Sequence, residues 1–133
     1  MKDYRLFIAF SSFVICFLII VFCLITGAFA EEGTASYYTW ESTRKEGNLG
    51  IMANGKKMDN KALTCAMWGL PFGTKVKVTN LENGKEVICE ITDRGPAKRL
   101  VKKGRIIDLS AGAFEKIGEL KTGVIRVKIE VCE

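Results

Sequence analysis

The sequence predicts a mainly β domain, a small closed barrel with one short helix, preceded by an N-terminal hydrophobic segment. Three observations carry this prediction. Short segments of alternating apolar and polar residues recur along the chain. Turns rich in glycine separate these segments, as in small closed barrels. Helical spacing with a defined start and stop occurs in the short segment 111–117.

The first thirty residues differ from the rest of the chain. Lys2 and Arg5 precede a long apolar run without charge, which ends in the small-x-small sequence Ala28-Phe29-Ala30. This pattern is typical of a secretory signal peptide, residues 1–30, cleaved after that sequence. An uncleaved anchor is the alternative, because the run is long enough to span a bilayer. In both cases we expect 31–133 to be one exported domain, in the cell envelope or outside the cell, with membrane contact only through the leader.

Strands are assigned from period-two alternation and β-prone residues. Segments 75–79 and 85–92 are predicted to form a hairpin, with Val87, Cys89 and Ile91 on one face of the returning strand. Further strands are expected in the segments 33–40, 106–109 and 125–131. The alternation therefore predicts strands that each bury one face.

The remaining segments are assigned from caps and turn residues. Ser110 is a good N-cap for a helix over 111–117, which Gly118 ends. Phe114 and Ile117, three residues apart, are expected to face the core. Segments 41–55 and 97–104, polar and basic respectively, are predicted to be loops.

Composition limits the chemistry available. The chain has 133 residues, a formal net charge of +5 and no histidine, which excludes catalytic Ser–His pairs and the commonest metal ligand. We expect a monomer with no metal, no cofactor and no nucleic-acid partner. The mild positive charge favours anionic partners such as cell-wall polymers, or only keeps a small domain soluble.

Three cysteines follow the leader: Cys65, Cys89 and Cys132. A disulfide is compatible with an exported domain. Three thiols allow three single pairings, and the sequence does not choose among them. Their spacing fits no zinc motif.

Two carboxylates mark a candidate site. Asp93 follows one apolar strand and opens a Gly-Pro turn, and Asp108 ends a second strand before the helix. We expect the two strand ends to meet and to carry the chemistry. The alternatives are structural: Asp93 shapes its turn, and Asp108 binds backbone amides at the helix start.

Aromatic and basic residues extend the candidate site. Tyr37, Tyr38 and Trp40 are candidates for stacking against sugar rings, or alternate members of this set belong to the core. Trp68 is expected either at a cleft wall or in the core. The basic segment 97–104 could bind anionic polymer or be a solvated loop.

The order of short motifs along the chain resembles the rare lipoprotein A (RlpA)-like family. The matching motifs include Ala53-Asn54-Gly55, Leu70-Pro71-Phe72-Gly73-Thr74, Asp93-Arg94-Gly95-Pro96 and Ile107-Asp108-Leu109-Ser110. The resemblance covers nearly all of the exported chain. It implies a six-stranded double-psi β-barrel related to expansin and barwin domains, and a lytic transglycosylase that acts on peptidoglycan glycan strands lacking stem peptides.

The resemblance also implies site residues. It makes Asp93 the acid/base and Asp108 a supporting carboxylate, with Arg94 a candidate substrate-binding residue. Two positions depart from active members of the family: Lys56 stands where they have Glu, and Met67 where they have His. These departures favour a second hypothesis, a non-catalytic, expansin-like module that binds or loosens peptidoglycan.

Overall fold

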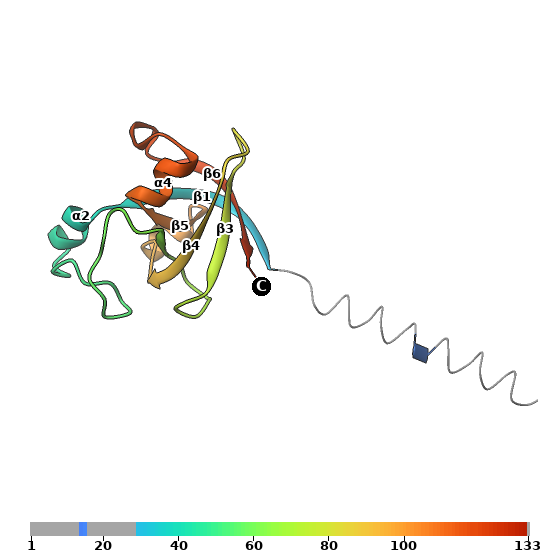
Figure 1. Cartoon of the computed structure of the whole chain (residues 1–133), viewed down its shortest axis with the longest axis horizontal. Helices are drawn as coiled ribbons and strands as arrows, with labels where there is room; N and C mark the ends of the chain where they lie inside the picture. The colour runs from blue at the N-terminus through green and yellow to red at the C-terminus, as the bar shows by residue number, and fades with distance from the viewer. Residues whose placement is uncertain (1–13, 16–28, 133) are drawn as a thin grey trace, which may run out of the picture.

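The computed structural model describes residues 14–15 and 29–132. Six strands form a closed barrel with the neighbour order β1-β5-β2-β4-β3-β6 (Figure 1). The predicted small six-stranded β-barrel is thereby confirmed. Their bounds are β1 Ala30–Tyr38, β2 Thr64–Ala66, β3 Lys75–Asn80, β4 Glu86–Asp93, β5 Arg105–Ser110 and β6 Ile125–Val131.

The barrel mixes parallel and antiparallel pairs. β1 pairs with β5, and β2 with β4, in parallel, while the other four pairs are antiparallel. The antiparallel β3–β4 pair is the hairpin that the sequence predicts. The short strand β2 pairs in parallel with β4 and antiparallel with β5, which brings the C-terminal parts of β4 and β5 to either side of it.

The core consists of the inward residues of each strand together with one helix face. On β4, Val87, Cys89 and Ile91 are all buried, as the alternation predicts. The helix α4, Ala111–Ile117, packs against β1, β4 and β5 and buries Phe114 and Ile117. Burial of apolar surface is the main favourable term in folding, so this shared core holds barrel and helix together.

Helix α4 begins and ends as predicted. The Ser110 hydroxyl accepts a hydrogen bond from the backbone N–H of Ala113 and donates one to the carbonyl of Ala62. It thus caps the helix and ties it to the segment before β2. Gly118 is the C-cap. Loss of such an N-cap costs about 1 kcal/mol.

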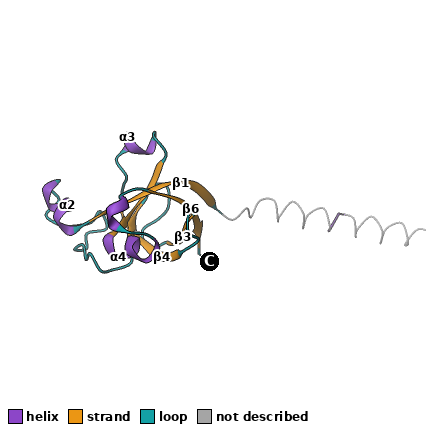
Figure 2. Cartoon of the chain, turned by 90° about the horizontal axis from the view of Figure 1, so that it is seen from above, coloured by secondary structure: helices purple, strands orange, loops and turns teal. Residues whose placement is uncertain are grey.

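The prediction of a single helix and of loops over 41–55 and 97–104 is wrong in detail. A helix α2, Trp40–Lys45, follows β1, and a one-turn helix α3, Lys98–Val101, precedes β5. Both lie on connections outside the barrel strands (Figure 2). In α2, Thr39 and Ser42 form a capping box, which satisfies backbone donors at the helix start in spite of the polar sequence. A single 3-10 turn, η1, covers Leu120–Thr122.

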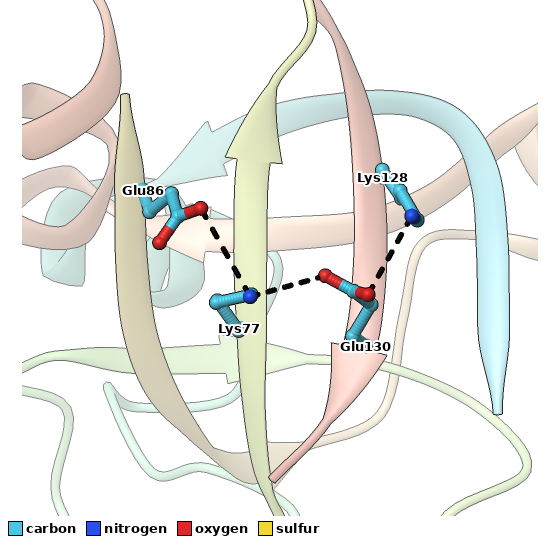
Figure 3. Close-up of polar contacts among 4 residues, drawn as sticks. All are labelled: Lys77, Glu86, Lys128 and Glu130. Carbon is cyan, nitrogen blue, oxygen red and sulfur yellow. Dashed lines mark ion pairs between the residues drawn. The ribbon is translucent and has the colours of Figure 1, made fainter. Parts of the chain in front are cut away.

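The outer face of the barrel carries a small ion-pair network (Figure 3). Lys77 on β3 lies 3.3 Å from Glu130 on β6 and 3.9 Å from Glu86 on β4, and Lys128 lies 3.5 Å from Glu130. These side chains are at least one-third exposed. Exposed ion pairs contribute little to stability, so the network assists strand pairing without defining the fold.

All three cysteines after the leader are free thiols. Cys65 and Cys89 are buried inside the barrel, whereas Cys132 is half-buried near the end of β6. A hydrogen bond with Cys89, together with burial, raises the pKa of the Cys65 thiol well above its ordinary value. The two buried thiols therefore act as small apolar core residues.

The predicted signal or anchor helix lies, except for 14–15 and 29–30, outside the described residues. In the part of the chain that the structure describes, no helix is both long enough and apolar enough to cross a bilayer.

Candidate functional site

A groove with a volume of about 400 Å³ contains both predicted carboxylates. We call it the central groove. It is formed by the ends of β1, β4 and β5, by α2 and by the connection that carries α3. Its walls include Ser36, Tyr38, Glu46, Ala66, Trp68, Asp93, Arg94, Gly95, Arg99, Arg105 and Asp108. The structure thus brings together the two strand ends that the sequence singled out.

Ala66 lies between the two carboxylates. It is in register with Asp93 on β4 and with Asp108 on β5. Because neighbouring strands are ~4.8 Å apart, the two Asp residues are separated by about 10 Å between Cα atoms. The small side chain of Ala66 keeps the space between them open, and Gly95 passes next to it.

A β-bulge lies beside each carboxylate. The β2–β4 register shifts after Cys65, so Ala66 is opposite Asp93 and Thr92 is skipped. The β1–β5 register shifts between Thr34 and Ala35, so Ile106 is skipped. Bulges redirect side chains and are common near active sites. Here they place a polar side chain on the groove side of each strand.

Asp93 is fixed by backbone donors. Its Oδ1 accepts hydrogen bonds of 2.8 Å from the N–H groups of Ala53 and Arg94. The Asn-Gly turn that contains Ala53 is thereby attached to the end of β4. Oδ2 accepts no hydrogen bond from the described residues, so half of the carboxyl group remains available to a ligand.

Asp108 is the more enclosed carboxyl group. Its Oδ1 accepts a 2.6 Å hydrogen bond from the Ser36 hydroxyl on the neighbouring strand. Burial raises the pKa of Asp108 above its ordinary value, and Glu46 adds to this, whereas the Ser36 hydrogen bond and the charge of Arg105 act in the opposite direction. Asp108 therefore keeps a proton to higher pH than a solvated Asp.

Arg94 braces the loop that follows β2. Its Nη1 donates to the carbonyl oxygens of Met67 (2.8 Å) and Leu70 (2.7 Å), and its guanidinium lies 4.0 Å from the centroid of the Phe72 ring. Arg94 also lines the central groove. Its main visible role is to hold the groove wall in place.

The aromatic candidates separate into two groups. Tyr38 and Trp68 line the central groove; the Trp68 indole donates a 2.7 Å hydrogen bond to the Pro96 carbonyl and its side chain is 41% exposed. Tyr37 also lines the groove, and its partly buried ring packs on Phe114 of the core, with 5.1 Å between centroids. Trp40, the first residue of α2, packs against Gly50 outside the groove.

Tyr38 lines the groove, and its hydroxyl is buried. It has no hydrogen-bond partner among the described residues, nor does the buried Thr64 hydroxyl. Burial raises the pKa of Tyr38, the Thr64 hydroxyl lowers it, and the negative charge of Asp93 raises it further. Tyr38 is therefore a neutral phenol, able to donate or accept a hydrogen bond.

The two positions that depart from the family pattern lie outside the central groove. Lys56 is exposed and makes no ion pair with the described residues. The Met67 side chain is buried in the core cluster, and its backbone N–H donates to the Asp93 carbonyl. Neither side chain is among those that line the groove with Asp93.

Ser36, Glu46 and Arg105 are groove residues that the sequence did not identify as site residues, whereas Arg99 belongs to the basic segment 97–104, a candidate for binding anionic polymer. Ser36 reaches Asp108 only through the parallel β1–β5 pair, 72 residues apart in sequence. Arg105 could have been noticed as a cation three residues before Asp108, but ordinary alternation would place the two on opposite faces. Among the residues described, no cluster of three His, Cys, Asp or Glu side chains could hold a metal ion.

Comparison with known proteins identifies the family. The model of the family described as lytic transglycolase matches residues 30–129. A Nostoc sp. protein named "Probable endolytic peptidoglycan transglycosylase RlpA" is 45% identical over 101 residues, 75% of this chain and 25% of its own length. The "Endolytic peptidoglycan transglycosylase RlpA" of Pseudomonas aeruginosa is 43% identical over 103 residues, 77% of this chain and 28% of its own. The chain belongs to the RlpA-like lytic transglycolase family.

Solved structures support the same fold for this RlpA-like domain. "Streptomyces papain inhibitor (SPI)" superposes with a TM-score of 0.58 at 24% identity, over 79% of this chain and 96% of that one. A mutant expansin of Clavibacter michiganensis, in complex with cellohexaose, gives 0.58 at 17% identity over 79% and 51%. These likenesses establish the double-psi barrel fold alone. The RlpA-like chain spans only about a quarter of the Nostoc and Pseudomonas relatives.

Proposed function

We propose that this RlpA-like domain is an exported peptidoglycan lytic transglycosylase that acts on glycan strands without stem peptides. The observation that supports it best is the central groove, which is lined by two Asp residues from different strands, on either side of Ala66. Relatives at 43–45% identity that bear the name endolytic peptidoglycan transglycosylase support the reaction class.

The reaction requires one proton donor and one proton acceptor. Cleavage begins when a carboxylic acid protonates the oxygen between N-acetylmuramic acid and N-acetylglucosamine. The C6 hydroxyl of the muramic acid then attacks its own anomeric carbon, the bond to the leaving oxygen breaks, and a 1,6-anhydro ring forms. A carboxylate takes the hydroxyl proton, so one carboxyl group can serve as acid and then as base. Water does not enter the reaction.

In this proposal Asp93 is the acid/base and Asp108 supports it. Asp93 has one oxygen fixed by two backbone N–H groups, while the other has no donor among the described residues, so the carboxyl group is oriented and accessible. Asp108 keeps its proton to a higher pH than a solvated Asp does, because burial raises its pKa. A neutral carboxylic acid can donate a hydrogen bond to a sugar hydroxyl. Trp68 and Tyr38 would contact the sugar rings, and Arg94 would hold the wall behind them.

The departures at Lys56 and Met67 do not remove the proposed machinery. The Lys56 side chain is exposed and the Met67 side chain belongs to the core, so neither occupies the space between the carboxylates. A mechanism that uses one carboxyl group for both proton transfers needs neither a Glu nor a His at these positions.

Product analysis tests the proposal. The full chain is incubated with purified glycan strands freed of stem peptides, and new 1,6-anhydromuramic ends are counted by mass spectrometry. Asp93→Asn should lower the rate by at least roughly 100-fold, the scale of general acid–base catalysis. Asp108→Asn should lower the rate by less than Asp93→Asn does, since the Asn side chain is neutral and keeps a hydrogen-bond donor. Asp59→Asn, the same change at an exposed site, should retain the wild-type rate.

Two results would contradict the proposal: no anhydro ends at high protein concentration, or full activity in Asp93→Asn. If Asp108→Asn cleaves at the wild-type rate, Asp108 does not contribute to the reaction and Asp93 is the only carboxyl group that does. A loss as large as that of Asp93→Asn would show that Asp108 transfers a proton itself.

A second function, non-catalytic binding or loosening of peptidoglycan, is favoured by one observation. Trp68 lines the groove and is 41% exposed, so it offers apolar surface to a sugar ring, while the Lys98 ammonium lies over the indole, 5.5 Å from its centroid. This function predicts co-sedimentation with insoluble peptidoglycan without new ends, and weaker sedimentation of Trp68→Ala. Leu49→Ala, an exposed apolar residue outside the groove, is the control.

A further inference from the structure

Arg105 lines the central groove with a guanidinium that has no hydrogen-bond acceptor among the described residues. Its Nε–H is buried and has no hydrogen-bond partner among the described residues. Within the same part of the chain Arg105 makes no ion pair. Nearly all buried polar groups in native proteins are paired. Nε itself is closed to solvent, but Arg105 lines the groove, so its guanidinium as a whole is a cation for which a ligand in the groove can supply the acceptor.

The bulge in the β1–β5 pair explains why Arg105 lines the groove. Thr34 is in register with Arg105 and Ala35 with Ile107, so Ile106 is passed over. Without this shift, residues three apart on a strand would lie on opposite faces. With it, Arg105 and Asp108 line the same groove, close enough for the positive charge of Arg105 to act on the Asp108 carboxyl group.

A second cation comes from a different element. Arg99, in α3, lines the same groove and is exposed. Arg94 also lines it, but its Nη1 is occupied by the carbonyl oxygens of Met67 and Leu70. Arg105 and Arg99 are therefore the groove arginines for which the described residues supply no hydrogen-bond acceptor.

We propose that Arg105, assisted by Arg99, forms a carboxylate-binding subsite for the free lactyl group of a muramic acid residue. This inference rests on the proposed function and names what the groove recognises in its substrate. Guanidinium groups bind carboxylates through paired, charge-assisted hydrogen bonds, which suits a groove guanidinium that lacks an acceptor.

The location fits a substituent of the reacting sugar. The lactyl ether is attached to the same ring whose anomeric carbon is attacked. Arg105 and Asp108 are three residues apart on one strand, about 10 Å between Cα atoms. One sugar ring with its lactyl arm, together with the long arginine side chain, spans this distance.

The subsite accounts for selectivity toward strands without stem peptides. Attachment of a peptide converts the lactyl carboxylate to an amide, which removes its negative charge and adds bulk. The arginine would then face a neutral group, and its buried donor would lose the charge-assisted partner. Discrimination is strong when a buried polar group is left poorly paired by the wrong substrate.

The test separates charge from bulk. Glycan strands without stem peptides are used as prepared, or after coupling of their lactyl carboxylates to methylamine, which leaves neutral N-methylamides and no peptide. Co-sedimentation affinity and the rate of anhydro-end formation are measured for the full chain on both strands. The wild type should favour the carboxylate strand by about tenfold or more, the scale of one charge-assisted hydrogen bond.

Variants locate the effect. Arg105→Gln should bind and cleave the carboxylate and methylamide strands equally well. Arg105→Lys should recover part of the preference for the carboxylate strand. Arg126→Gln removes the same charge from an exposed position on β6 and should keep the wild-type ratio. Arg99→Gln, at an exposed residue, should reduce the ratio, and it provides the measurement if Arg105→Gln does not fold.

The possible outcomes are distinct. Equal action of the wild type on both strands overturns the subsite and leaves the transglycosylase proposal standing. An unchanged ratio in both Arg105→Gln and Arg99→Gln also overturns it. If the wild type neither binds nor cleaves either strand, the proposed function fails and the subsite fails with it. A preference that depends on Arg105 and weakens with salt supports the subsite.

Discussion

The Ser36 hydroxyl on β1 donates a 2.6 Å hydrogen bond to Oδ1 of Asp108 on β5. The two residues are in register in a parallel pair of strands, so the contact is a direct product of the barrel topology. It connects the neighbouring strand to the chemistry of the groove, because this hydrogen bond lowers a pKa that burial raises.

Removal of that hydroxyl should raise the pKa of Asp108 further. In Ser36→Ala the carboxylate loses a donor that stabilises its charged form, while its burial stays the same. The pKa is measured from the carboxyl carbon shift in an NMR pH titration. Thr122→Ala, a hydroxyl loss at an exposed residue, is the control. An unchanged or lower pKa in Ser36→Ala would contradict this account of the Asp108 environment.

Asp108→Asn should stabilise the domain at neutral pH. Because the folded-state pKa of Asp108 is raised, its ionisation opposes folding, so the free energy of unfolding of the wild type falls as pH rises through that pKa. Asn stays neutral and can still accept the Ser36 hydrogen bond. The gain in urea denaturation should therefore be present at pH 7 and vanish below the ordinary Asp pKa of 3.8. A gain that persists at low pH would assign the effect to packing instead.

Arg94→Ala should destabilise the domain by about 1–3 kcal/mol. The substitution leaves the carbonyl oxygens of Met67 and Leu70 without their donor and removes the contact with the Phe72 ring. The free energy of unfolding is measured by urea titration. Arg126→Ala, which removes an exposed arginine, should change it by less than ~0.5 kcal/mol. Equal stability of the two variants would show that Arg94 does not brace the wall.

Substitution of two glycines with the same φ distinguishes the cost of backbone strain from the cost of a steric clash. Gly50 and Gly84 both have φ of 75°, but a Cβ at Gly50 would collide with the Trp40 indole, whereas a Cβ at Gly84 meets nothing within 4 Å. Gly84→Ala should cost about 1–2 kcal/mol for the left-handed conformation alone. Gly50→Ala should cost clearly more and shift the tryptophan fluorescence. Equal costs, measured by urea denaturation, would mean that Trp40 moves aside freely.

Local sequence patterns determined much of the barrel. Alternation predicted the β3–β4 hairpin and the strand β6, because one buried face per strand imposes a period of two. Ser110 and Gly118 predicted the bounds of α4, because both act through backbone groups within one turn. The motif order predicted the family and its fold. The helices α2 and α3 were missed, because a capping box and a single turn leave little hydrophobic periodicity.

The sequence by itself also determined that Asp93 and Asp108 lie on two strands, since each follows an apolar run; Asp93 ends β4, whereas Asp108 lies two residues before the end of β5. Only the tertiary structure decided that both lie beside Ala66, that Ser36 reaches Asp108, and that Trp40 lies away from the groove that Tyr37, Tyr38 and Trp68 line. The physical reason is that parallel pairing joins residues more than 70 apart, and a single skipped residue reverses the face of every side chain beyond it. The position of Arg105 in the groove follows from one such bulge, which no local pattern encodes.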